Sequence, residues 1–268
     1  MKELIYVIKD FIQSIHPLII FIIVFLVGLY VFWRGCTESR KNRSSVFDIF
    51  LVSGFLSSVI GRIVYIVTTW ETFSSFIWYW LPYEKYGDKI YLFRLLPWRF
   101  FSVWDGGLII LGMFVSMLVF LTFFVLVIKR WRWKHMFFPI YFASTTMLGV
   151  SFIYTGITSG FNEWVYKGLI LITVLVAFFL FFKFIYKIVK NPIYEKYILG
   201  YVGLLTVLIS SVYIVYLYLS SELTLLEDIL VGIFLIWTLV MSTFFLSDLR
   251  RAKVNIKSVS TIRSIKLE

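Results

Sequence analysis

Residues 103–128 read VWDGGLIILGMFVSMLVFLTFFVLVI, and the residues that follow, 129–134, read KRWRWK. A run of about 20 apolar residues is long enough to cross the hydrocarbon core of a bilayer as an α-helix. Lysines and arginines gathered at one end of such a run are typical of a cytoplasmic loop. This stretch therefore predicts a transmembrane helix whose second end lies on the cytoplasmic side.

The same pattern recurs along the chain. Of its 268 residues, 60% are hydrophobic and only 15% are charged, which is too little charge to cover a water-soluble domain of this length. We therefore predict an all-α polytopic membrane protein with seven transmembrane helices, forming one domain over residues 1–268. The predicted spans are residues 17–33, 46–70, 103–128, 137–158, 168–185, 198–219 and 225–246.

The formal net charge of +11 is spread between the apolar runs. A nucleic-acid-binding protein would gather such charge in one patch, so we expect no nucleic-acid partner. Basic residues follow the first, third, fifth and seventh predicted spans, whereas Glu222, Glu227 and Asp228 follow the sixth span without a basic neighbour. The positive-inside rule therefore places the amino-terminus outside and the carboxy-terminus in the cytoplasm. We expect no cleavable signal, because residues 1–16 mix polar and apolar side chains.

The connection at residues 71–102 is long, rich in Trp, Tyr and Phe, and predicted to lie outside. Tryptophan suits the membrane interface, where the indole ring is buried while its N–H group stays hydrated. Two interpretations remain open for this loop. It is either a belt of interfacial anchors or a small extracytoplasmic cap on the membrane surface, and the predicted fold includes the cap.

Ionisable groups inside a span are costly and are therefore candidates for function. Arg62 lies well inside the second span, on a stretch with small residues that let another helix approach closely. Its guanidinium either binds a lipid phosphate through paired N–H donors or extends to the outer interface. Asp48, near the inner end of the same span, is expected to face cytoplasmic water. At the predicted start of the third span, Asp105, Gly106 and Gly107 can leave backbone N–H groups free for an anionic head group.

Other reactive side chains are few. Cys36 is the only cysteine, His16 lies at the outer end of the first predicted span, and His135 lies in a predicted cytoplasmic basic loop. This set contains no pattern typical of a nucleophile with its base or of a metal-ligand cluster. We therefore expect no metal and no cofactor, and interpret Cys36 as a bystander thiol.

Three segments together resemble the prolipoprotein diacylglyceryl transferases, bacterial enzymes that move diacylglycerol from phosphatidylglycerol onto a lipoprotein cysteine. Residues 33–48 followed by Gly61-Arg62-Ile63-Val64-Tyr65 are similar to the family's basic loop and its Gly-Ala-Arg-hydrophobic-Gly-Tyr segment. Residues 103–108, with Pro97 before them, resemble its Trp-acidic-Gly-Gly-Leu segment. Residues 221–224 are similar to its outer turn before the last span.

The resemblance implies a seven-helix fold in the bacterial plasma (inner) membrane, with phosphatidylglycerol and prolipoprotein signal peptides as partners. It further implies that Arg62 contacts the lipid phosphate and that Tyr65 lines a phospholipid cavity opening laterally to the bilayer. The Asp105-Gly106-Gly107 turn would shape the head-group site.

The chain departs from the family pattern at three places. Leu111 stands where the family has a histidine thought to be essential, and residues 148–156 lack the Arg and Asn of the span-four signature. Span six has Ser210, Ser211 and Tyr213 in place of Arg and Glu. A leucine cannot accept a thiol proton, and no cation remains in span four to hold a phosphate.

Two main hypotheses follow from these matches and departures. The chain is a divergent transferase, or it is a catalytically degenerate relative that binds lipid or a partner helix. Arg94 and Arg99 from the outer loop are the candidates to approach Arg62 in space. A transporter is less favoured, because the spans lack interrupted helices and paired midplane charges.

Overall fold

A computed structural model describes residues 14–37, 42–103, 107–160, 162–188, 192–220 and 224–265. Within these ranges, seven helices are long and apolar enough to cross a membrane, which confirms the predicted all-α polytopic class. The helices are α2 (Pro17–Thr37), α3 (Arg43–Thr68), α5 (Ile110–Phe123), α6 (Phe137–Ser159), α7 (Asn162–Ile188), α8 (Pro192–Leu219) and α9 (Leu225–Ile265). A π-helical turn, η3 (Phe124–Ile128), prolongs α5, and a 3-10 turn, η4 (Trp133–His135), precedes α6.

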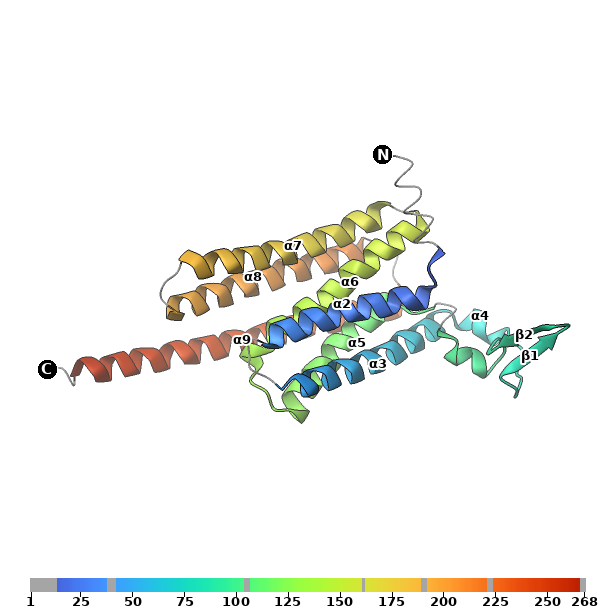
Figure 1. Cartoon of the computed structure of the whole chain (residues 1–268), viewed down its shortest axis with the longest axis horizontal. Helices are drawn as coiled ribbons and strands as arrows, with labels where there is room; N and C mark the ends of the chain where they lie inside the picture. Colours follow the sequence, from blue (N-terminus) through green and yellow to red (C-terminus); the bar gives the residue numbers. More distant parts are fainter. Residues whose placement is uncertain are drawn as a thin grey trace.

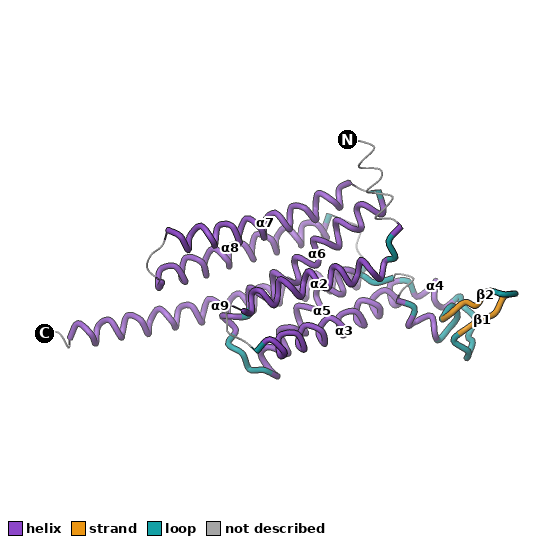
Figure 2. Tube along the Cα trace, viewed as in Figure 1, coloured by secondary structure: helices purple, strands orange, loops and turns teal. Residues whose placement is uncertain are grey.

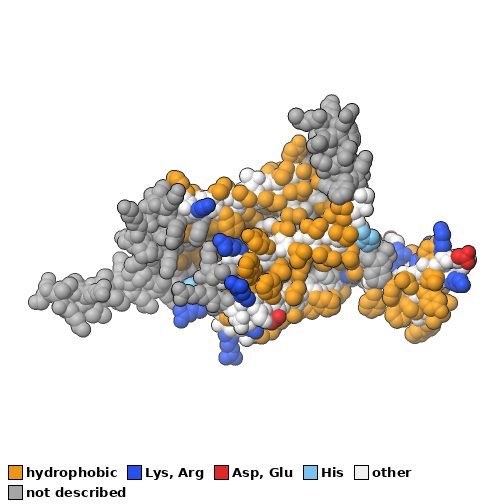
Figure 3. Space-filling view, viewed as in Figure 1, with side chains coloured by type: hydrophobic (Ala, Val, Ile, Leu, Met, Phe, Trp, Pro, Cys, Tyr) orange, Lys and Arg blue, Asp and Glu red, His pale blue; other side chains and the backbone are white. Residues whose placement is uncertain are grey.

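The long helices lie side by side in one bundle (Figure 1). Helix α6 contacts α2, α5 and α7, while α3 packs on α5, and α8 lies between α7 and α9. Aromatic rings fill the core: Phe137 is fully buried, with its ring centroid 5.1 Å from Phe245 and 5.5 Å from Trp133. The flank seen in Figure 3 is mostly hydrophobic, as expected for a surface whose solvent is lipid.

Helices α6 and α7 approach each other closely through glycines. A Cβ atom added at Gly168 would lie 2.5 Å from the carbonyl oxygen of Gly149 and 2.9 Å from the backbone nitrogen of Ile153. Small residues at helix contacts let backbones approach, which is the usual source of helix association in a bilayer.

Residues 70–103 fold as a small unit, here named the cap. It comprises α4 (Trp70–Ser74), the antiparallel strands β1 (Tyr83–Tyr86) and β2 (Lys89–Leu92), and the 3-10 helix η1 (Trp98–Phe101). Gly87, with φ of +60°, begins the tight turn between the strands, where a positive φ favours glycine. The cap projects from one end of the bundle, and α9 extends beyond the other end (Figures 1 and 2).

Several helices begin or end at residues other than the predicted span limits, and two of these differences have clear physical reasons. The third span begins as a helix at Ile110 rather than at Val103, because Gly107 has φ of +79° and the backbone N–H of Ile109 bonds the carbonyl of Gly61 in α3. The seventh helix does not stop at residue 246. It continues to Ile265, since the end of the apolar run does not interrupt helical backbone hydrogen bonds.

Candidate functional site

Arg62 lies on α3 where the helix meets the cap, and only 7% of its surface is exposed. Its Nε donates to the carbonyl of Phe100 at 3.1 Å, Nη1 to the carbonyl of Gly107 at 3.1 Å, and Nη2 to the carbonyl of Arg99 at 2.8 Å. The side chain points toward the cap end of the bundle but is covered there by protein. Arg62 thus joins α3 to the backbone on both sides of the connection from the cap to α5.

The structure brings three of the predicted site residues together. Gly107 lies against Arg62 and Tyr65, so closely that an added Cβ would overlap the Tyr65 ring and the Arg62 guanidinium. Its positive φ also favours glycine. Asp105 and Gly106, the other two predicted residues, lie outside the described residues.

Phe73 of α4 is the centre of a cluster of cations and rings. The Cζ atoms of Arg62 and Arg99 lie 5.7 Å and 5.3 Å from its ring centroid. Phe100 stacks on the same ring at 5.7 Å, and Tyr65 meets it edge-on at 6.0 Å. We call these five residues the arginine–aromatic junction, and note that Phe73, at 2% exposure, is fully enclosed by it.

The two arginines of the cap that were candidates to approach Arg62 differ in their surroundings. Arg99 is half-buried, and its Cζ atom lies 3.5 Å from the centroid of Phe76. Within the described part of the chain, no hydrogen-bond acceptor contacts its guanidinium. Arg94 is exposed and stacks on Tyr91 of the hairpin at 5.1 Å. Of the two candidates, Arg99 approaches Arg62 and Arg94 does not take part in the junction.

Buried apolar side chains stand at the positions where the resemblance calls for reactive groups. Leu111 is 2% exposed and belongs to the hydrophobic core. In the span-four stretch, Phe152 is equally buried, with ring centroids at 5.2 Å from Trp164 and 5.9 Å from Tyr218. Neither Leu111 nor Phe152 can transfer a proton or carry charge.

A buried hydroxyl network links α6 to α8. The Tyr141 hydroxyl lies 2.8 Å from the hydroxyls of both Ser210 and Ser211, and 3.2 Å from the carbonyl of Val207. Sequence reasoning placed the two serines but missed Tyr141, because a tyrosine in an apolar run carries no signal of its partner. The network is uncharged and joins helices rather than forming a nucleophile–base pair.

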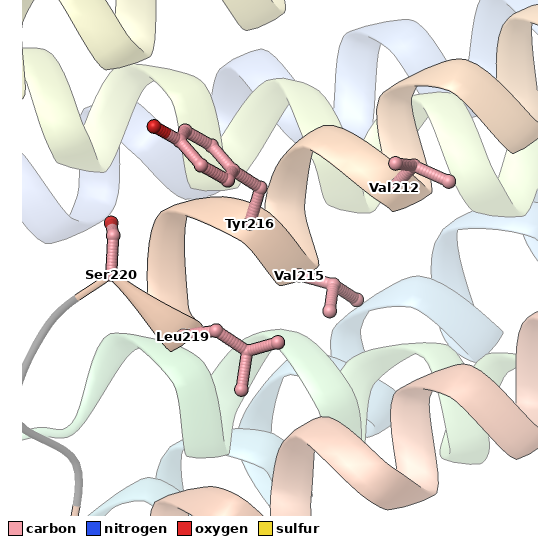
Figure 4. A pocket seen from close by; sticks show the side chains of 5 residues that line it. All are labelled: Val212, Val215, Tyr216, Leu219 and Ser220. Carbon is pink, nitrogen blue, oxygen red and sulfur yellow. The ribbon is translucent and has the colours of Figure 1, made fainter.

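A cavity of about 350 Å³ lies beside α8 and is lined by Val212, Val215, Tyr216, Leu219 and Ser220. Figure 4 shows that Val212, Val215, Tyr216 and Leu219 come from α8 and that Ser220 directly follows its last residue. Val212, Tyr216 and Leu219 are each about two-thirds exposed, so this cavity is a shallow part of the lipid-facing surface. Its apolar lining suits an acyl chain and offers no acid, base or cation.

Among the described residues, no group of three or more His, Cys, Asp or Glu side chains is placed to hold a metal ion. Comparison of the chain with protein-family models, curated proteins and solved structures finds no match.

Proposed function

We propose that this chain is a non-catalytic membrane protein that binds phospholipid, with an architecture like that of the prolipoprotein diacylglyceryl transferases. The proposal rests on the surroundings of Leu111 and Arg62, the two positions on which transfer chemistry would depend. Leu111 is packed in the core, and the donors of Arg62 are bonded to backbone carbonyls. A base must reach the proton that it removes by a hydrogen bond, and leucine forms none.

Arg62 is a poor candidate for the lipid phosphate in this arrangement. Turning its guanidinium toward a ligand would break charged hydrogen bonds, each worth about 1.5–3 kcal/mol, and leave three partly buried backbone carbonyls without these donors. A phospholipid bound by this protein would therefore be held by other residues. Binding of a membrane lipid remains consistent with the exposed apolar flank and with the shallow cavity on α8.

We further propose the bacterial plasma membrane as the location, with the amino-terminus and the cap outside and the carboxy-terminus in the cytoplasm. The contact of Lys129 Nζ with Ser45 Oγ at 3.4 Å supports this orientation. It brings the basic loops after the first and third spans together at one end of the bundle, as the positive-inside rule requires.

The test is an assay of the purified protein with phosphatidylglycerol and a lipobox peptide, beside a working transferase. We expect no diacylglyceryl thioether, and we expect native mass spectrometry in mild detergent to detect retained phospholipid. Formation of the thioether would contradict the non-catalytic proposal. Absence of any retained phospholipid would contradict lipid binding.

Transferase activity is the second candidate function. It is favoured by the convergence of Arg62, Tyr65 and Gly107, the residues that the resemblance assigns to the lipid site. Thioether formation that is lost in a folded Arg62→Gln variant would establish this candidate, including prolipoprotein signal peptides as partners.

A further inference from the structure

We propose that Arg99 binds the phosphate group of a membrane phospholipid where the cap meets the bundle. This inference deepens the proposed function, because it names the residue that holds the lipid. It assigns the role to a residue outside the segments that carry the family resemblance.

The guanidinium of Arg99 lies against aromatic rings of the cap. Phe76 covers it at 3.5 Å and Phe73 lies 5.3 Å away, so the group is supported by aromatic rings. Stacking of arginine on a ring leaves the N–H donors directed outward in the guanidinium plane. Two parallel donors of this kind match the oxygens of a phosphate. Arg62 uses its donors on backbone carbonyls, whereas no described residue accepts a hydrogen bond from the Arg99 guanidinium.

The charges of two arginines meet at the arginine–aromatic junction. Arg62 and Arg99 both lie within 6 Å of the Phe73 centroid, and no described carboxylate forms an ion pair with Arg99. Two like charges beside one ring repel each other. A bound phosphate would lower that repulsion. The chemistry of the site therefore fits an anion rather than a neutral or cationic ligand.

The location of Arg99 favours a lipid as the source of the phosphate. Ile63 and Val67 on α3 are 48% and 52% exposed, and Trp70 at the start of α4 is 55% exposed, so an exposed apolar surface runs from α3 onto the cap. Phe101, two residues from Arg99, is 64% exposed, and Ile77 is 75% exposed. Hydrophobic side chains also cover much of the cap in Figure 3, and charged side chains gather at the tip that lies farthest from the bundle. Arg99 thus lies where apolar and polar surfaces meet, the level of the head groups.

The experiment compares Arg99→Gln with the matched control Arg94→Gln, which removes the same charge from the cap outside the junction. The full chain is reconstituted in nanodiscs with phosphatidylglycerol, extracted in mild detergent, and its retained lipid is counted by native mass spectrometry. We expect Arg99→Gln to lower retention about tenfold, and Arg94→Gln to leave it unchanged, because only Arg99 forms the paired contact. Equal retention by the two variants would overturn the inference while leaving the proposed function intact. No retention by the unchanged chain would overturn the proposed function itself.

A second measurement does not depend on the folding of a variant. Phenylglyoxal modification of Arg99 in the unchanged chain is mapped by peptide mass spectrometry in detergent alone, in mixed micelles of detergent and phosphatidylglycerol, and in detergent with inorganic phosphate. Protection by the lipid supports the inference, and protection by both ligands supports it through the shared phosphate chemistry. Protection by inorganic phosphate alone overturns the lipid as the source, and protection by neither overturns the site.

Discussion

Arg62 stabilises the protein through its shape as well as its charge, because its forked donors reach three backbone carbonyls at once. Arg62→Lys keeps the charge but cannot form the fork. We expect it to lower the free energy of unfolding by about 2 kcal/mol or more, the value of one or two charged hydrogen bonds. Thermal unfolding in detergent measures this loss. The exposed Arg94→Lys is the control, and equal melting of Arg62→Lys and the control would contradict the structural role of Arg62.

Tyr141→Phe tests the hydroxyl network at the same scale. It removes the group that joins α6 to Ser210 and Ser211 of α8, and we expect a loss of about 1 kcal/mol, as for hydrogen bonds between membrane helices. A double-mutant cycle with Ser211→Ala isolates the pair. Strictly additive losses would show that the two hydroxyls do not interact.

At the residue scale, the sequence identified charged groups but not their partners. Arg62 is visible as a charge inside an apolar run. Its acceptors depend on the path of the backbone around Gly107, which the left-handed conformation of that glycine determines. Arg99 carried no signal of its aromatic support, because Phe73 and Phe76 lie in another part of the cap and meet it only in the fold.

At the α6–α7 contact, a larger residue in place of Gly168 would meet backbone atoms of the neighbouring helix, which cannot move aside as a flexible side chain can. Gly168→Val would drive a side chain into the backbone of α6 near Gly149, and we expect a loss of 1–3 kcal/mol, typical of overpacking. The matched control is Gly232→Val, since an added Cβ there meets nothing within 4 Å. Thermal unfolding in detergent compares the two. Equal stability of both variants would contradict the close approach of the two helices.

The positions of the transmembrane helices were predictable where the thickness of the bilayer fixes their length. The span starting near residue 137 matched its helix closely, because the required apolar length is fixed by the membrane. The predicted fold included the cap, but the sequence left the alternative of an interfacial belt open, since aromatic residues suit both. Its hairpin depends on pairing of Tyr83 with Leu92, a contact that composition does not reveal.

At the scale of the whole molecule, the two ends of the bundle differ in charge and in structure. Basic connections, including residues 129–134, lie at the end from which α9 extends, and the cap occupies the opposite end. The positive-inside rule places the basic connections in the cytoplasm, which puts the cap and the proposed Arg99 site at the outer face. Both placements depend on which face of the membrane each end of the bundle occupies.

Cysteine labelling in intact cells answers that question most directly. In a Cys36→Ser background, single cysteines are introduced by Lys85→Cys in the hairpin, and by Lys134→Cys and Lys190→Cys in the basic connections. We predict that a membrane-impermeant maleimide labels the hairpin cysteine in intact cells and the other two only after lysis. Labelling of the residue-134 and residue-190 positions from opposite faces, or of the hairpin only after lysis, would contradict the seven-span arrangement and the proposals built on it.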